Sequence, residues 1–415
     1  MGGYVHSGLR QNTLWAALGL LTIFSPHASS STLLLVSIDG FRWDYLDRPE
    51  AEALRAIAAS GSRVEQLETV YPSKTFPAHL SIATGLPPTG HGIVDNYFCR
   101  SDRPDCYDMG DGRKDPIWLS GTPLWTLVEE QGGRASTFFW PESDALFNGT
   151  LPTDYRRYDG RIPHSERVQQ TLEWLALPEL ERPELITLYF SVVDSAGHQY
   201  GPDSDATREA IAEVDHWLGI LWRAIVDQNR EDPEADINLM IVSDHGMASV
   251  DPDEFIDTQT LPKHAGFKRV NNSTRVLYYQ RDPDADIDRL REALESAAAG
   301  RFWVVEASEL EARDSKGHPA VPDLVIETAP PRVFRHGGGK DADLRGMHGY
   351  PSDIEAMAAL WMAAGPAFRP WHVIARAHQL DVYPVAARVL GLTPPEGLPS
   401  DGGPLLEALN TPEGE

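Results

Sequence analysis

Three short apolar runs, rich in branched side chains, each end on an aspartate. They are residues 32–38 before Asp39, residues 185–193 before Asp194, and residues 237–243 before Asp244. A continuous apolar run of this length is typical of a strand buried on both faces, as in a parallel sheet covered by helices. We therefore expect the three aspartates to lie together at the carboxyl edge of one sheet, where ligands of such folds gather.

Helical patterns alternate with these runs, at residues 51–59, 123–131, 166–175 and 205–226. Alternation of buried strands with helices predicts an α/β fold, with a mostly parallel central sheet and helices on both faces. We find no repeat and no long linker, so we expect one domain over residues 31–415. Further strands around a helix at residues 285–298 indicate a small cap at about 262–335.

The three aspartates belong to a larger set of acid, hydroxyl and imidazole side chains at strand ends and helix starts. Its members are Asp39, Thr75, Asp194, His198, Asp244, His245 and His348. Carboxylates and neutral imidazoles are ordinary zinc ligands, and the spacing from Asp194 to His198 can chelate one ion across a helical turn. Singly, each residue has a plainer explanation, such as an Asp-Gly turn at Asp39 or a helix cap at Thr75. Their combination favours a metal site.

Thr75 lies two residues before Pro77, which suits the first turn of a helix. A helix start presents free N–H groups to an anion, so a phosphoryl group attacked by Thr75 would meet the N–H of Phe76. Metal coordination is one way to activate such a hydroxyl near neutral pH. His79, one turn further along, is interpreted as a packed or supporting histidine. The pattern predicts a two-metal hydrolase of phosphate esters.

The net charge of the chain limits the kinds of partner it can bind, and its N-terminal sequence indicates where the protein is located. With 62 acidic against 36 basic residues, the formal net charge is -26, which argues against a binding partner such as duplex nucleic acid. Residues 1–30 read as an export signal, with an apolar run too short to span a bilayer comfortably. We expect a periplasmic or secreted protein without a transmembrane segment in the mature chain; an uncleaved anchor is the alternative. Cys99 and Cys106 would form a disulfide there.

Six segments, taken in order, resemble one family. They are Val36–Gly40 (VSIDG), the segment around Thr75, Gly90–Asn96 (GHGIVDN), Asp194-x3-His198-x2-Gly201-Pro202, Asp244–Met247 (DHGM) and His348-Gly349. This set is similar to that of the nucleotide pyrophosphatase/phosphodiesterase family within the alkaline phosphatase superfamily. The resemblance extends from about residue 32 to residue 390 and implies an alkaline-phosphatase-like sandwich.

The resemblance also implies a centre with two zinc ions per chain. One zinc would be held by Asp39, Asp244 and His245 and would bind the Thr75 oxygen, and the other would be held by Asp194, His198 and His348. Asn96 would donate its side-chain amide to a non-bridging phosphate oxygen. The implied activity is hydrolysis of nucleotide phosphodiester or pyrophosphate bonds through a phospho-threonine intermediate. No arginine lies beside Thr75, and Lys74 can project away from it.

The choice of small-molecule substrate is less constrained. Phe76, Tyr158 and Tyr189 could clasp a nucleobase by stacking, although Tyr189 lies in an expected buried strand and can instead be a core residue. Trp140 begins a segment that resembles one lining the family's substrate pocket, but its Glu142 departs from the small residue expected there. Aromatic and acidic groups would equally suit a choline phosphodiester or lysophospholipid. A phosphomutase and a non-catalytic zinc protein are further alternatives, which export and an intact Thr75 disfavour.

Overall fold

The computed structural model describes residues 1–2, 31–306, 309–310, 318–337 and 343–410. The expected export signal, residues 1–30, therefore lies outside the described residues except at its first two positions. Among the residues that are described, no helix is both long and apolar enough to cross a membrane.

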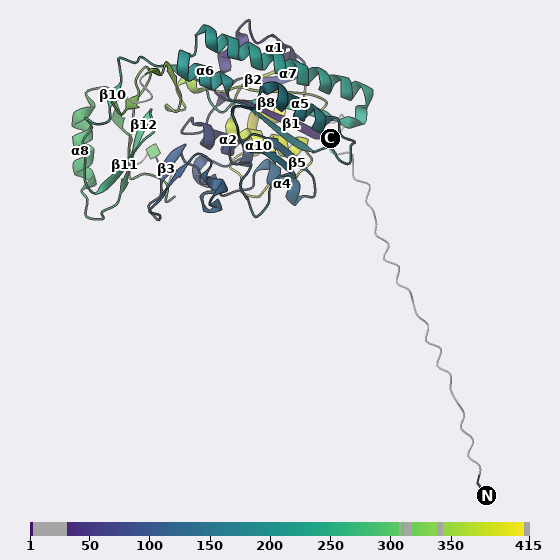
Figure 1. Cartoon of the computed structure of the whole chain (residues 1–415), viewed down its shortest axis with the longest axis horizontal. Coiled ribbons are helices and arrows are strands. Elements are labelled where there is room, and N and C mark those ends of the chain that lie inside the picture. The colour runs from purple at the N-terminus through teal and green to yellow at the C-terminus, as the bar shows by residue number, and fades with distance from the viewer. Residues whose placement is uncertain (3–30, 307–308, 311–317, 338–342, 411–415) are drawn as a thin grey trace.

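A sheet of eight strands forms the centre of the molecule (Figure 1). Its strands are β1 (Thr32–Ile38), β2 (Ser62–Glu68), β5 (Ala135–Phe138), β6 (Asp154–Arg156), β7 (Leu185–Phe190), β8 (Ile237–Val242), β17 (Trp361–Ala364) and β18 (His372–His378). They lie in the order β18-β2-β17-β8-β1-β7-β5-β6. All neighbours pair in parallel except β17, which is antiparallel to both β2 and β8. The predicted mostly parallel sheet is confirmed, and β1 lies between β7 and β8.

Alternate side chains of β1 enter two different apolar layers, because successive residues of a strand point to opposite faces. Leu33 and Leu35 belong to a cluster that includes residues of α2 (Thr75–Thr84), α4 (Leu124–Glu130) and α10 (Val382–Val389). Leu34 and Val36 belong to a second cluster, with residues of α1 (Glu52–Ala59), α5 (His164–Leu175) and α7 (Asp205–Glu231). Helices therefore cover both faces of the sheet, as predicted.

Two expected strands end earlier than their apolar runs. The run at 185–193 leaves the sheet at Phe190, because the chain winds directly into α6 (Val192–Tyr200). The run at 237–243 ends at Val242, where the turn that carries Asp244 begins. At both strand ends, polar side chains therefore lie at the edge of the sheet, within a few residues of the last strand position.

A separate antiparallel sheet lies within the interval expected to form a cap. It consists of β11 (Phe267–Asn271), β12 (Arg275–Gln280), β14 (Leu324–Glu327) and β13 (Trp303–Val304), and α8 (Ile287–Ala298) packs on it. Its apolar cluster includes Val276, Tyr278 and Leu290. We call these strands and α8 the four-stranded lobe. It lies beside β3 (Tyr97–Cys99), at the left of Figure 1.

Candidate active site

The acidic and imidazole side chains expected from the sequence meet at the carboxyl edge of the sheet. They form two groups, and within each group the possible ligand atoms lie within 4.8 Å of one another. One group is Asp39, Asp244 and His245, and the other is Asp194, His198 and His348. The groups have the membership that the family resemblance implied. They converge because β1 pairs with both β7 and β8, so the residues that follow these strands come to one place.

The helix α6 brings Asp194 and His198 onto one face. Four residues apart, they lie with Oδ1 of Asp194 3.3 Å from Nε2 of His198. Gly40 allows α6 to approach β1 this closely. At its φ of +70°, a Cβ atom on Gly40 would lie 2.8 Å from the Asp194 Cα. A side chain there would push α6 away from the site, so this turn requires glycine.

Each carboxylate of the site has an oxygen that lies near a histidine Nε2 but accepts no hydrogen bond from the described residues. The Gly40 N–H donates to Oδ1 of Asp244 at 3.0 Å, and the Tyr189 hydroxyl donates to Oδ2 of Asp39. Within the described structure, Oδ1 of Asp39, Oδ2 of Asp244 and Oδ1 of Asp194 are buried without a hydrogen-bond partner. Burying such oxygens is unfavourable unless something compensates. A cation between them would do so, and the residues therefore fit a metal centre.

The three imidazoles are oriented by backbone carbonyl groups. In each, Nδ1 lies beside a carbonyl oxygen: His198 beside Gly346 at 2.9 Å, His245 beside Gly246 at 2.9 Å, and His348 beside Ser73 at 3.0 Å. A carbonyl oxygen can only accept, so Nδ1 carries the proton and donates it. The lone pair of Nε2 then faces the acidic groups, which is the arrangement of a metal-binding histidine.

The electrostatics of the site favour positive charge. Burial raises the pKa of Asp39 well above its usual range, and the carboxylates of Asp244 and Asp194 raise it further. Burial likewise raises the pKa of Asp244 to about 8. Burial opposes the charged form of His198, but Asp194 outweighs that effect and raises its pKa to about 9. A metal ion would relieve the repulsion between the carboxylates and replace the proton on His198.

Thr75 is the first residue of α2, and its Oγ1 lies 3.4 Å from Nε2 of His245. The alternative reading of Thr75 as the helix cap does not hold, because Lys74 occupies the N-cap position. The Phe76 N–H, expected to face a phosphoryl group, instead donates to Oδ1 of Asn96 at 2.9 Å. This contact satisfies a free donor of the helix start. It also leaves the amide nitrogen of Asn96 as the available donor.

The residues expected to bind substrate all line one cavity of about 520 Å³, together with Thr75. They are Phe76, Asn96, Trp140, Tyr158 and Tyr189. Tyr158 is 59% exposed and can present its ring to a ligand. Tyr189 is buried at 7% exposure and its hydroxyl holds Asp39, so the structure favours the alternative of a core residue over stacking at this position.

Trp140 forms a wall of the cavity rather than an open stacking surface. It is buried, and its indole N–H donates to the carbonyl oxygen of His79 at 3.2 Å. The two rings meet edge to face at 5.2 Å. Both nitrogens of His79 are engaged, Nδ1 with the Thr75 carbonyl at 2.8 Å and Nε2 with the Ser37 hydroxyl at 2.7 Å. His79 is thus a supporting histidine, as expected.

The sequence suggested that Lys74 can project away from the site, but the structure places its side chain beside the site. It is buried, and its Nζ donates to the carbonyl oxygens of His348 at 3.3 Å and Asn272 at 3.1 Å. Burial lowers the pKa of Lys74 to about 8. A second buried cation, Arg275 of β12, pairs with Asp95 at 2.7 Å and holds the turn before Asn96. Sequence reasoning missed these contacts because each joins residues that lie far apart along the chain.

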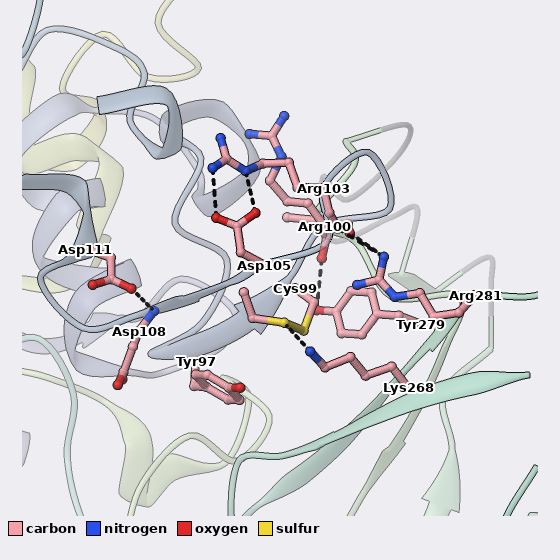
Figure 2. The surroundings of a disulfide bond; sticks show 12 residues. Tyr97, Cys99, Arg100, Arg103, Asp105, Asp108, Asp111, Lys268, Tyr279 and Arg281 are labelled. Carbon is pink, nitrogen blue, oxygen red and sulfur yellow. Dashed lines mark hydrogen bonds and ion pairs between the residues drawn. A yellow bond between two sulfur atoms is a disulfide. The ribbon is translucent and has the colours of Figure 1, made fainter. Parts of the chain in front are cut away.

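A disulfide joins Cys99 and Cys106, the expected pair, between β3 and β4 (Cys106–Asp108) (Figure 2). The hairpin rests on the four-stranded lobe. Nζ of Lys268 lies 2.8 Å from Sγ of Cys106, and the Arg281 guanidinium donates to the carbonyl oxygen of Arg100 at 2.9 Å. The four-stranded lobe therefore supports the hairpin that leads from Asn96 to the cavity-lining residues Met109 and Gly110.

The mostly parallel sheet is covered on both faces and carries paired acid–imidazole groups beside a helix-start hydroxyl, which places the protein in the class with an alkaline-phosphatase-like fold. Comparison with known proteins identifies the family within this class. The family model for type I phosphodiesterase / nucleotide pyrophosphatase matches residues 33–351. The chain therefore belongs to the nucleotide pyrophosphatase/phosphodiesterase family.

Curated relatives and solved structures agree with this assignment. Ectonucleotide pyrophosphatase/phosphodiesterase family member 1 of Rattus norvegicus is 31% identical over 420 residues, covering 94% of this chain and 44% of the relative. Venom phosphodiesterase CdcPDE of Crotalus durissus collilineatus is 29% identical over 404 residues, covering 92% of this chain and 47% of the relative. The chain thus spans about half the length of the curated relatives that it matches.

Among solved structures, murine ectonucleotide pyrophosphatase/phosphodiesterase 5 superposes with a TM-score of 0.82 at 26% identity, over 92% of this chain and 100% of that chain. A second structure of the murine protein, an inactive threonine-to-alanine variant in complex with AMP, gives the same TM-score of 0.82.

Proposed function

We propose that this protein is a zinc-dependent phosphodiesterase and pyrophosphatase that cleaves nucleotides through a phospho-threonine intermediate. The observation that carries the proposal is the place of the Thr75 hydroxyl, 3.4 Å from His245 and on the wall of a cavity that Asp39, Asp194 and aromatic side chains also line. One murine structural neighbour is an inactive variant, with a single threonine replaced by alanine, in complex with AMP, which supports a threonine in the reaction and a nucleotide as the substrate class.

In this proposal, each acid–imidazole group binds one zinc ion. Asp39, Asp244 and His245 hold the first, and Asp194, His198 and His348 hold the second. Carboxylate oxygens with neutral imidazoles suit zinc, although such sites also accept manganese or cobalt. When bound, the ions lower the pKa of the attacking hydroxyl and offset the negative charge of the phosphoryl group. The carbonyl contacts of the three imidazoles keep Nε2 ready for this role.

The reaction proceeds in two displacements. The Thr75 hydroxyl gives up its proton to solvent, and its oxygen forms a bond to phosphorus as the bond from phosphorus to the leaving oxygen breaks. The leaving group departs with its electron pair and takes up a proton from solvent. Water then attacks the phosphorus of the phospho-threonine as the bond from phosphorus to the Thr75 oxygen breaks. The water gives up a proton and the Thr75 oxygen takes one up, which restores the hydroxyl and releases a nucleoside monophosphate.

Asn96 is the proposed donor to the phosphoryl oxygens. The Phe76 N–H fixes its carbonyl oxygen at 2.9 Å, so the amide nitrogen is free to donate. We expect Asn96→Ala to lower kcat/KM by about 100- to 1000-fold, the loss typical of one donor to a developing oxyanion. Asn96→Asp is the matched control, because it keeps an acceptor for Phe76 but removes the donor. If Asn96→Asp retained wild-type kcat/KM, the donor role would be wrong.

A nucleotide suits the cavity better than a choline ester does. Glu142 is the acidic group that could hold a choline together with Tyr158 and Trp140, but its carboxylate accepts from the Tyr107 hydroxyl and the Gly112 N–H. Arg113 and Lys114 also line the cavity and favour an anionic ligand.

We therefore expect kcat/KM for p-nitrophenyl thymidine monophosphate to exceed that for p-nitrophenyl phosphorylcholine by about tenfold or more, since stacking of a base contributes about 1–3 kcal/mol. The difference should shrink in Tyr158→Ala, which removes the exposed ring. A preference of the wild-type enzyme for the choline ester would overturn the nucleotide assignment.

We further propose that the enzyme acts outside the cytoplasm. Residues 1–30 have the pattern of an export signal, and relatives are named as ectonucleotide or venom enzymes. N-terminal sequencing of the mature protein tests this, with a start near residue 31 expected.

A further inference from the structure

Glu142 occupies an unfavourable position in the wall of the substrate cavity. Its φ is +61°, in the left-handed region that disfavours residues other than glycine. Its side chain is also buried, at 3% exposure, although a carboxylate is seldom buried without partners. Burial accordingly raises the pKa of Glu142 to about 6. Neither the backbone conformation nor the burial favours glutamate at position 142. The contacts of the Glu142 side chain must therefore explain why a glutamate is found there.

Those contacts all lead to one loop. Oε1 of Glu142 accepts from the Tyr107 hydroxyl at 2.5 Å and from the Gly112 N–H at 3.1 Å. Oε2 lies so near Gly112 that a Cβ atom there would be 2.7 Å away. The carboxylate is therefore enclosed by the loop from Tyr107 to Lys114, which we call the outer loop.

The outer loop forms part of the wall of the cavity. Met109, Gly110, Arg113 and Lys114 of this loop all line the cavity. The loop begins on β4 of the disulfide hairpin, and Figure 2 shows Asp108 and Asp111 of the loop to the left of the disulfide. The Tyr107 ring stacks on Phe98 at 4.9 Å and meets the Phe76 ring edge to face at 6.5 Å. Glu142 thus connects the outer loop to the wall that contains Trp140.

We propose that Glu142 is a positioning residue that holds the outer loop against the cavity and so determines how tightly substrates with a large group beyond the phosphate bind. The inference rests on the proposed phosphodiesterase function. Small diesters contact the metal groups and Thr75 without reaching the outer loop. Substrates with a nucleoside or second phosphate fill the cavity to that wall. Loss of the Glu142 contacts should therefore affect large substrates selectively.

The experiment compares two substrates in two variants. Glu142→Gly removes the carboxylate at a backbone position that suits glycine, so folding should be preserved, and Glu142→Gln retains one acceptor oxygen. For p-nitrophenyl thymidine monophosphate we expect KM to rise about tenfold in Glu142→Gly and less in Glu142→Gln, with kcat nearly unchanged, because a loosened wall must be ordered on binding. For methyl p-nitrophenyl phosphate we expect no change in either variant.

Glu129→Gln is the matched control. Its carboxylate also accepts from two backbone N–H groups, of Ala135 at 2.9 Å and Thr153 at 2.7 Å, but Glu129 does not line the cavity described above. KM should be unchanged in this variant for both substrates. Equal losses on both substrates in Glu142→Gly, or an unchanged KM for the nucleotide ester, would overturn the inference.

Hydrogen exchange of peptides that cover residues 107–114 tests the positioning role without any turnover. We expect exchange in Glu142→Gly to be faster by about tenfold or more than in the wild type and in Glu129→Gln. Unchanged exchange in the outer loop would contradict the positioning role. Failure of the wild-type enzyme to cleave either ester would instead contradict the proposed function and leave the exchange result to decide the role of Glu142.

Discussion

Replacing Thr75 by alanine is expected to abolish hydrolysis of p-nitrophenyl thymidine monophosphate while leaving bound metal nearly unchanged. The variant lacks the oxygen that would form the phospho-threonine, so kcat should fall by at least about 1000-fold. Metal should remain, because the six acid and imidazole ligands are untouched. Steady-state kinetics and metal analysis of the same preparation measure the two quantities together.

The structure explains why this substitution should leave the fold intact. Lys74 holds the N-cap position of α2, and the side chain that accepts from the helix start is that of Asn96, at the Phe76 N–H, so alanine at Thr75 removes no cap. Thr75→Ser is the matched control, because it keeps the hydroxyl and should keep measurable turnover. A Thr75→Ala enzyme that retained more than a few per cent of the wild-type rate would rule out Thr75 as the nucleophile.

The central sheet was readable from the sequence because its strands are buried on both faces. The run at 32–38 coincides with β1, in which every residue is buried, including the polar Thr32 and Ser37. The ends of β7 and β8 were less certain. Apolar side chains continue past Phe190 into α6, and composition alone does not distinguish the last residue of a strand from the first turn of a buried helix.

The candidate metal ligands could also be predicted from the sequence, because they are acid and imidazole side chains at strand ends and helix starts. The contacts that support them were not. Lys74 and Arg275 find their partners in the four-stranded lobe or in loops distant in sequence. Tyr189 lies in a buried strand as expected, yet its bond to Asp39 depends on the register of β7 against β1, which pairs Ser37 with Tyr189. Such contacts depend on tertiary packing and have no characteristic spacing along the chain.

His348 gives the sharpest test of the proposed metal centre, because it joins its group from a distant loop. Its Nε2 lies 3.8 Å from Oδ1 of Asp194, and Nδ1 is held by the Ser73 carbonyl. We expect His348→Ala to lower affinity at one of the two sites by more than about 100-fold, since even loss of a residue that only supports a ligand costs about 10- to 100-fold. Bound zinc should fall from two ions per chain to one, and turnover should be lost.

Thermal unfolding with added zinc provides a second measurement. Zinc at about 100 times its dissociation constant stabilises a folded protein by about 2.7 kcal/mol per site, and His348→Ala should lose this contribution from one site. His164→Ala is the matched control. His164 also pairs with a carboxylate, Glu213 at 2.8 Å, but belongs to neither ligand group, so its zinc content and stabilisation should match the wild type. Two equivalents of zinc bound by His348→Ala with unaltered affinity would mean that the two groups are not the metal sites.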